Sequence, residues 1–153
     1  DYLYLLLDDS ETEPSISLDQ QAVTLQKGES ATLTATVDPA ETTVKWSSSN
    51  EKVATVDQNG KITALSSGTA VITAELPDGT KATCTVTVYL LGDLNNDGSV
   101  TITDVMEACK VLARKSQDIV PSADEILRGD LTGDGFFTIT DVMAICKILA
   151  SKE

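Results

Sequence analysis

The chain has 153 residues, enough for one medium domain or two small ones. Its formal net charge of −13 argues against a nucleic acid or an anionic membrane as a partner, because both need a basic protein surface. The sequence has no histidine, which removes the commonest general base and the usual activator of a nucleophile, so we expect no enzyme. No apolar run approaches the roughly 18 residues that a membrane-spanning helix needs.

The N-terminal residues carry few signals. The longest apolar run, Tyr2 to Leu7, is too short for the core of a signal peptide and lacks a basic flank. We interpret residues 1–13 as an N-terminal segment, compatible with the end of a preceding domain, and expect the chain to be a fragment of a longer protein. The three cysteines have no C-x-x-C spacing, so neither a zinc knuckle nor a redox dithiol is indicated.

Residues 14–91 alternate between apolar and polar side chains with period two, which predicts an all-β domain. The stretch from Ala31 to Val37 places small and apolar residues on one face and threonines on the other, as in a half-buried strand. Similar runs are 43–47, 53–56, 61–65, 69–75 and 80–89. Turn signals separate them, among them Asn59-Gly60 and Pro77-Asp78-Gly79. This regular spacing predicts a small β-sandwich.

Two residues of this part are candidates for its core. Trp46 is the only tryptophan and lies in the middle of a predicted strand, so we interpret it as a residue packed between the sheets; a ligand-stacking role is the alternative. Cys84 shares its parity with Val86 and Val88, which predicts a buried thiol that acts as a small apolar side chain.

The run from Val44 to Ala74, with Trp46, Ser-Ser-Asn, Val-Ala-Thr-Val, Asn-Gly and Gly-Thr-Ala in order, resembles the bacterial immunoglobulin-like domain of group 2. Domains of that family are extracellular spacers and surface modules, some of them adhesive. The resemblance implies an immunoglobulin-like sandwich in an exported protein. It favours a structural spacer over a domain that binds a partner or a sugar.

From Gly92 the pattern changes, and nearly the same sequence occurs twice. Residues 92–114 and 129–151 align at an offset of 37, and fifteen of these 23 positions are identical. A repeat this close predicts one function performed twice, or one symmetrical surface.

Each copy carries oxygen-bearing side chains at loop positions 1, 3, 5, 9 and 12, and its backbone carbonyl at position 7 adds another ligand. In the first copy the predicted calcium ligands are Asp93, Asn95, Asp97, Ser99, Thr101 and Asp104. In the second copy they are Asp130, Thr132, Asp134, Phe136, Thr138 and Asp141. Position 6 is Gly98 or Gly135, where the chain must turn sharply. Calcium takes about six to eight hard oxygen ligands, so the sequence predicts two calcium ions.

The loops depart from an EF-hand loop at two positions. Position 12 is Asp instead of Glu, so the loop has to close further around the ion. Position 3 of the second copy is Thr132, a neutral hydroxyl, and we expect the second site to be the weaker one. Two solvated acidic turns are the alternative, but the register of the copies and the apolar helix after each argue against it. Magnesium is a poorer candidate because it prefers a tight octahedral shell.

An apolar stripe at helical spacing follows each loop. Its members are Val105, Ala108, Cys109 and Leu112 in the first copy and Val142, Ile145, Cys146 and Leu149 in the second. Between the copies, Pro121 to Glu125 predicts the start of a further helix, with Ser122 as its cap. No helical pattern precedes either loop, so the unit is a loop followed by a helix, half of an EF-hand.

This duplicated unit, from Gly92 to about Lys152, resembles a dockerin. The resemblance implies a small all-α dockerin domain at residues 92–153 that binds a cohesin domain of a scaffold or cell-surface protein. Such cellulosome-type extracellular complexes of anaerobic bacteria degrade polysaccharides. In that family the cohesin contacts lie at loop positions 10 and 11 and then at about 14, 17 and 18. These positions hold Ile102, Thr103, Met106, Cys109 and Lys110, and in the second copy Ile139, Thr140, Met143, Cys146 and Lys147.

Several alternatives remain at the level of single residues. The cysteines at position 17 can instead edge the helix core, and the lysines at position 18 can be ordinary solvated side chains. The Ile-Thr pairs at positions 10 and 11, where many dockerins carry Ser/Thr pairs, indicate a more apolar interface.

The expected function is therefore a non-catalytic, calcium-dependent docking module, monomeric when unbound, that anchors its parent protein to a cohesin. The immunoglobulin-like domain acts as a spacer and steadies the dockerin, as in X-module–dockerin pairs. The near-identical copies predict two docking modes related by a rough two-fold. The alternative is an extracellular adhesion or carbohydrate-binding fragment with structural calcium sites. A calcium sensor is disfavoured, because the loops lack the preceding helices that opening requires.

Overall fold

A computed structural model describes residues 13–152. The predicted N-terminal segment 1–13, with the run from Tyr2 to Leu7, lies outside the described residues except for Glu13. The strands are β1 (Ser15–Leu18), β2 (Ala22–Gln26), β3 (Ser30–Thr32), β4 (Ala35–Asp38), β5 (Lys45–Ser48), β6 (Ala54–Val56), β7 (Lys61–Ala64), β8 (Gly68–Glu75) and β9 (Lys81–Tyr89). The helices are α2 (Ile102–Lys115), α3 (Ala123–Gly129) and α4 (Ile139–Ala150). No described helix has the length and apolar character of a membrane span.

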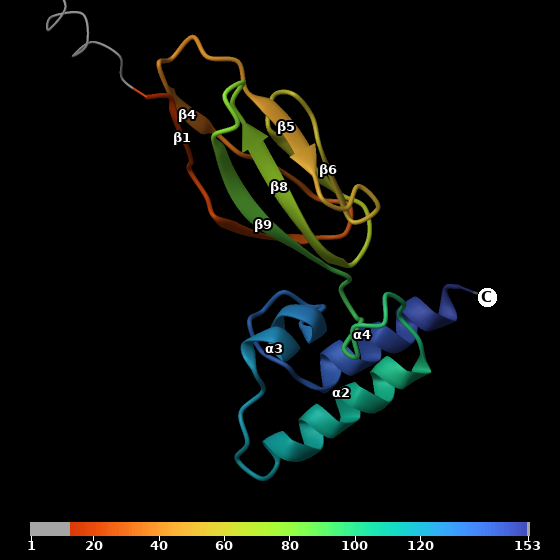
Figure 1. The fold of residues 1–153 in the computed structure, drawn as a ribbon. Helices are drawn as coiled ribbons and strands as arrows, with labels where there is room; N and C mark the ends of the chain where they lie inside the picture. Colours follow the sequence, from red (N-terminus) through yellow and green to blue (C-terminus); the bar gives the residue numbers. More distant parts are fainter. Residues whose placement is uncertain (1–12, 153) are drawn as a thin grey trace, which may run out of the picture.

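The strands form small sheets that pack as a sandwich, and the helices form a separate body that follows β9 (Figure 1). A four-stranded sheet has the order β2-β9-β8-β5, a three-stranded sheet has the order β3-β7-β6, and β1 pairs with β4. Pairing is antiparallel except between β2 and β9, which run parallel. The fold class predicted from the sequence, an all-β sandwich followed by an all-α part, is confirmed.

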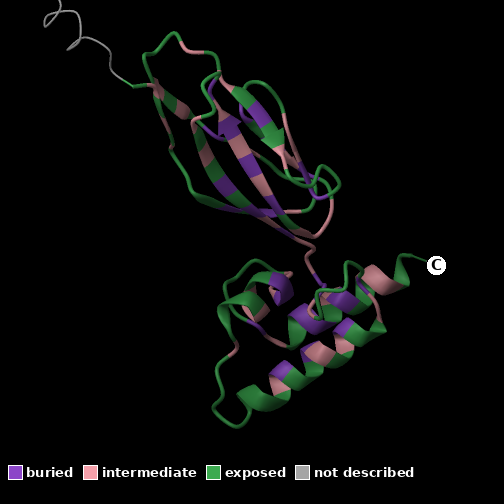
Figure 2. Cartoon of the chain, viewed as in Figure 1, coloured by how far each residue is buried: buried purple, intermediate pink, exposed green. Residues whose placement is uncertain are grey.

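The core of the sandwich collects the apolar face of each strand (Figure 2). Trp46 is 7% exposed, and both Ile72 and Cys84, which lie opposite each other in β8 and β9, are fully buried. These findings confirm the core roles predicted for Trp46 and Cys84. The backbone at Gly60 has a φ of +81°, and a Cβ there would meet both the Leu33 carbonyl and the Trp46 ring, so only glycine fits this turn.

The sequence predicted one strand from Ala31 to Val37, but the structure has two strands there, β3 and β4. The facing of this stretch is as predicted, because Leu33 is buried and the threonines are exposed. At Leu33 and Thr34, however, the backbone bonds to Gly60 and Asp19 instead of continuing along one partner strand. The chain therefore leaves the three-stranded sheet after β3 and joins β1 through β4.

The helical part has its own core, between α2 and α4. Its fully or nearly fully buried members include Ala108 and Val111 of α2 and Ile145 of α4. Val100 and Phe137, which occupy position 8 of the two loops, are also buried there. Both loops thus contribute a side chain to the core that the two helices share.

The apolar stripe predicted for each helix was wrong at one position. Cys109 and Cys146 are exposed, whereas Val111, which the stripe left out, is buried. Successive residues of an α-helix are rotated by about 100°, so a buried arc centred on Ala108 and Val111 leaves Cys109 at its side. The cysteines are free thiols on the surface of the helical part.

The third helix starts as predicted. Ser122 is the N-cap of α3, and its hydroxyl accepts a hydrogen bond from the N–H of Glu125 at 3.1 Å. The Glu125 carboxylate accepts one in return from the N–H of Ser122 at 2.8 Å. The pKa of Glu125 lies below its usual value. The hydrogen bond from the Ser122 N–H and the ion pair with Arg114 lower it, and together they outweigh partial burial, which raises it. The same ion pair links α3 to α2.

Candidate metal centre and docking faces

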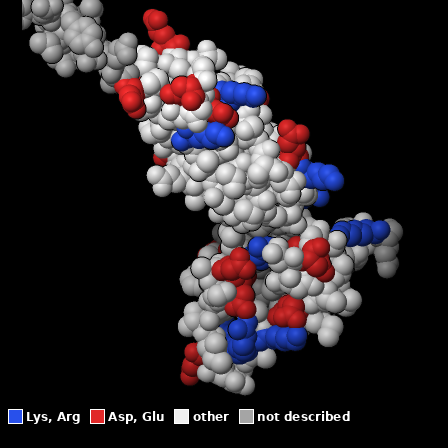
Figure 3. Space-filling model, in the orientation of Figure 1, with Lys and Arg blue, Asp and Glu red and all other residues white. Residues whose placement is uncertain are grey.

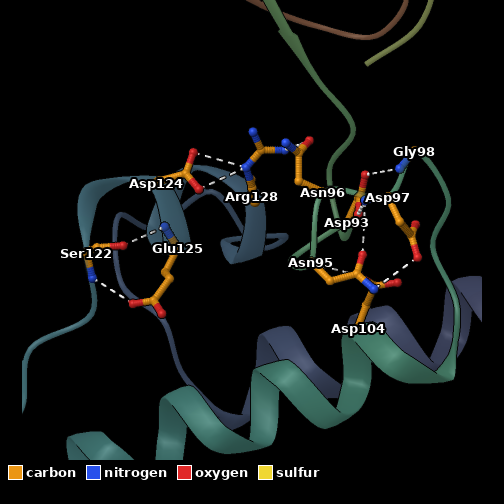
Figure 4. A network of polar contacts seen from close by, with 10 residues as sticks. All are labelled: Asp93, Asn95, Asn96, Asp97, Gly98, Asp104, Ser122, Asp124, Glu125 and Arg128. Atoms are coloured by element: carbon orange, nitrogen blue, oxygen red, sulfur yellow. Dashed lines mark hydrogen bonds and ion pairs between the residues drawn. The ribbon is translucent and has the colours of Figure 1, made fainter. Parts of the chain in front are cut away.

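The first loop is organised around the carboxylate of Asp93, which is fully buried. One of its oxygens accepts a hydrogen bond from the N–H of Asp97 at 3.0 Å, and the other accepts one from the N–H of Gly98 at 2.9 Å. Gly98 has a φ of +89°, which confirms the sharp turn predicted at position 6. The loop therefore wraps around the side chain of its first residue (Figure 4).

Asn95 and Asp97 lie on the exposed side of this loop. The side-chain oxygen of Asn95 accepts a hydrogen bond from the N–H of Asp97, and its side-chain NH2 group donates one to the Asp97 carboxylate at 2.9 Å. The other oxygen of Asp97 accepts a hydrogen bond from the N–H of Ser99 at 2.9 Å. Residues at positions 3, 5 and 7 are thus held next to one another.

Asp104 closes the loop from the first turn of α2. Thr101 is the N-cap of this helix, and its N–H donates to the Asp104 carboxylate at 2.7 Å. The other carboxylate oxygen accepts from the N–H of Asn95 at 3.2 Å. Asp104 is fully buried although it is charged, because its carboxylate points from the helix into the loop.

The second loop repeats this arrangement. The Asp130 carboxylate accepts hydrogen bonds from the N–H groups of Gly133, Asp134 and Gly135 at 2.7–3.2 Å. Asp134 in turn accepts one from the N–H of Phe136 at 2.9 Å. Partial burial raises the pKa of Asp130, but the N–H groups of the loop and a hydroxyl outweigh it, and the pKa lies below its usual value.

Thr132 and Asp141 complete this second loop. The Thr132 hydroxyl lies 3.1 Å from an oxygen of Asp130 and 3.0 Å from an oxygen of Asp141, so it links positions 1 and 12. Asp141 is fully buried and also accepts a hydrogen bond from the N–H of Thr138, the N-cap of α4, at 2.8 Å. Asp141 therefore occupies the place that Asp104 has in the first loop. Asp130, however, is only half-buried, and within residues 13–152 a close cluster of three carboxylates occurs in the first loop and not in this one.

The first loop fits a divalent cation by two criteria. Ligand oxygens of Asp93, Asp97 and Asp104 all lie within 4.8 Å of one another. Oxygens that are each about 2.3–2.6 Å from one calcium ion are at most about 5 Å apart, so one ion can contact all three. The donors are also chemically suitable, because carboxylate, amide and hydroxyl oxygens are the hard ligands that calcium takes.

All ten residues that the sequence assigned to partner contacts are exposed. Ile102 and Met106 on α2 are 64% and 57% exposed, and their equivalents Ile139 and Met143 on α4 are 59% and 57% exposed. Large apolar side chains that stay this exposed on two equivalent helix faces are typical of an interaction surface. Exposure of Cys109 and Cys146 removes the alternative that these cysteines belong to the helix core.

The two faces are similar but not identical in charge. Lys110 forms an ion pair with Glu107 at 2.6 Å, whereas the residue equivalent to Glu107 in the second copy is Ala144. On the face shown in Figure 3, the lysines and arginines of the helical part alternate with acidic side chains and form no continuous basic patch.

Sequence reasoning missed Arg128, which connects α3 to the first loop. Its side chain donates to the Asp124 carboxylate at 3.0 Å and to the Asn96 side-chain oxygen at 3.0 Å, and its backbone carbonyl accepts from the N–H of Gly92 at 2.7 Å. Arg128 is nearly fully buried. A basic residue in the last turn of a short helix gives no signal of such a contact, because Asn96 is 32 residues away in the sequence.

Comparison with known families divides the chain into two parts. A family model described as bacterial Ig-like domain (group 2) matches residues 14–88, and one described as dockerin type I domain matches residues 91–150. Among solved structures, domains 5–6 of the S-layer protein SbsC share 21% identity with this chain. That match covers 50% of this chain and 45% of the other, with a TM-score of 0.42.

Curated relatives are much longer than this chain. The chain is 49% identical over 69 residues to a protein named lacto-N-biosidase from Bifidobacterium bifidum, which covers 44% of this chain and 6% of the relative. It is 37% identical over 102 residues to a protein named alpha-L-arabinofuranosidase from Bifidobacterium longum subsp. longum, which covers 64% of this chain and 10% of the relative. The chain therefore spans a tenth or less of these two proteins.

Proposed function

Because this chain carries a bacterial Ig-like domain of group 2 followed by a dockerin type I domain, we propose that it anchors its parent protein to a cohesin of an extracellular, cellulosome-type complex. Neither kind of domain is catalytic, and dockerin type I domains are calcium-dependent docking modules. The proposed domains are residues 14–91 and 92–153. The observation that carries this function is the cluster of three carboxylates in the first loop, together with the same exposed apolar face on the helix after each loop.

The proposed calcium sites consist of the ligands predicted in each loop, with one ion in each. The carboxylates at positions 1, 5 and 12 of the first loop supply charge, and the side chains at positions 3 and 9 with the carbonyl at position 7 supply neutral oxygens. Without a cation, three carboxylates this close repel one another. A bound ion therefore favours the closed loop, from which the following helix starts.

The proposed cohesin contacts are the exposed residues at positions 10, 11, 14, 17 and 18 of each copy. Their central members are the isoleucines and methionines, because burying apolar side chains supplies most of the affinity of an interface. The lysines at position 18 lie at the edge, where charge affects the association rate more than affinity. Since each of the five residues is identical between the copies, we propose two docking modes, one centred on each helix.

The Ig-like domain is proposed as a spacer that steadies the dockerin. Support comes from the junction, where a Cβ added at Gly98 would lie 3.4 Å from the hydroxyl of Ser67, so the turn before β8 lies beside the first calcium loop. Carbohydrate binding is less favoured, because Trp46 is buried and offers no stacking platform. The names of the relatives support a glycoside hydrolase as the parent protein.

A panel of immobilised cohesin domains tests this function. We expect at least one cohesin to retain the chain in calcium and to release it when a chelator is added. The double variant I102A/T103A and the double variant I139A/T140A should each keep binding within about twofold of the parent protein, because loss of one of two equal modes changes the free energy by only RT ln 2, about 0.4 kcal/mol.

The quadruple variant I102A/T103A/I139A/T140A should lose binding. Its folding is checked by helix content in calcium, so that a loss of binding is not a loss of structure. Retention by none of the cohesins, or retention that a chelator leaves unchanged, would contradict the proposed function. Loss of binding in one double variant alone would leave calcium-dependent docking intact and restrict it to a single mode.

A further inference from the structure

Two lysines connect the repeats in a reciprocal way. The ammonium group of Lys115, the last residue of α2, donates to the backbone carbonyl of Phe137 at 3.0 Å. The ammonium group of Lys152, just after α4, donates to the backbone carbonyl of Val100 at 3.2 Å. Each lysine thus belongs to one repeat, and its acceptor belongs to the other.

The two contacts are equivalent under the internal repeat. Lys115 and Lys152 are separated by the same 37 residues as Val100 and Phe137, although the lysines lie beyond the 23 positions that align most closely. The acceptors occupy position 8 of their loops, between the carbonyl proposed as a calcium ligand at position 7 and the threonine proposed at position 9. The same contact thus occurs twice, from the first repeat to the second and from the second to the first. It follows from the way the two repeats pair and is not an isolated contact of one surface lysine.

Each acceptor residue is held from two sides. The side chains of Val100 and Phe137 are 5% and 1% exposed in the core between α2 and α4, and their carbonyls accept the lysines. Phe137 also packs so closely on Gly129 that a Cβ there would overlap its ring. Position 8 is therefore fixed by its side chain and, through the lysine, by the end of the opposite helix.

We propose that Lys115 and Lys152 are positioning residues for calcium, each acting on the loop of the opposite repeat. By holding the position 8 carbonyl, each lysine stabilises the closed form of the stretch that carries the ligands at positions 7 and 9, which is the form that binds the ion. This inference rests on the proposed calcium sites. An ammonium group also repels a cation, so the proposal requires that ordering of the loop outweighs this repulsion.

A calcium titration of the labelled, metal-free chain, followed by the backbone amides of Gly98 and Gly135, tests the proposal. Their N–H groups donate to Asp93 and Asp130, so each amide reports one loop in the same sample. We expect K115M to move the Gly135 midpoint to roughly three- to tenfold higher calcium and the Gly98 midpoint less, in line with the loss of one partly solvated charged hydrogen bond. K152M should do the reverse.

Controls separate positioning from general effects. Lys45 lies in β5, far along the chain from the loops, so K45M makes the same charge change and should leave both midpoints unchanged. K115R keeps a charged donor, so the calcium concentration at its Gly135 midpoint should lie close to that of the parent chain. Equal movement of both midpoints in K115M, or a lower Gly135 midpoint, would overturn the proposal. If neither glycine responds to calcium in the parent chain, the calcium sites themselves fail, which is a different result.

Discussion

At the scale of single residues, position 3 distinguishes the two loops. The Asn95 side chain offers an amide oxygen, and its amide nitrogen donates to Asp97 and Thr103. Thr132 offers only a hydroxyl, which lies within hydrogen-bonding distance of Asp130 and Asp141 and gives its proton to one of them. A hydroxyl is a weaker ligand for calcium than an amide oxygen, so the second loop starts with one poorer donor.

Exchanging these residues tests that difference. We expect T132N to tighten calcium binding at the second loop by about threefold or more, because a neutral amide oxygen joins the ligand set. N95T should weaken the first loop by a similar factor. The double exchange N95T/T132N should reverse the order of the two sites. Site-resolved calcium titration measures all three, and an unchanged order in the double variant would show that position 3 does not set the difference.

The ligand positions were accessible from the sequence because their spacing is local. Asp93, Asp97 and Asp104 lie within twelve consecutive residues, so the repeat alone indicates that they meet. The contacts of Arg128 with Asn96 and of Lys115 with Phe137 were not accessible, because these partners lie 32 and 22 residues away and depend on how the helices pack. For the contact of Lys115 with Phe137, the available signal in the sequence was that a lysine, Lys152, recurs 37 residues later.

At the scale of elements, the helices depend on the loops. The cores of α2 and α4 are small, and the helices have 14 and 12 residues, close to the length at which isolated helices are marginal in water. Each helix also starts at a loop whose position 12 carboxylate is buried. Closure of the loop by an ion therefore stabilises the first turn of the helix.

Removal of calcium should consequently unfold the helical part. With excess chelator we expect most of the helical circular dichroism signal at 222 nm to disappear and to return when calcium is added. Trp46 is an internal control, because it lies in the sandwich core and its fluorescence should not change. Helix content that persists in chelator would contradict this dependence, and a change in Trp46 emission would show that the sandwich also relies on the ions.

The sequence predicted most elements, with errors that have physical causes. Period-two alternation located the segments of β5 to β9 to within about two residues. It did not delimit β1 and β2, whose partners come from distant parts of the chain. The division between β3 and β4 depends on a change of bonding partner at Leu33, which alternation cannot reveal. The spacing of apolar residues did not show which residue lies at the centre of the buried face of α2. That centre lies at Ala108 and Val111, so Cys109 is exposed.

At the scale of the whole molecule, the last strand of the sandwich leads almost directly into the first loop. Only Leu90 and Leu91 separate β9 from Gly92, and Leu90 packs against the helical core. The lining of a pocket at this junction includes Tyr89 of the sandwich and Asp130 of the second loop. The sandwich therefore lies close to both loops, which supports its proposed role of steadying the docking module.

The proposed function requires two loops that each hold a calcium ion through three aspartates, and calorimetric titration of calcium into the metal-free chain tests this most directly. We predict saturable binding of two ions per chain. In the variant D93N/D97N, which removes two carboxylates from the first loop and leaves the second intact, we predict one. Saturation at two ions in this variant, or no saturable uptake by the parent chain, would contradict the assignment of the loops.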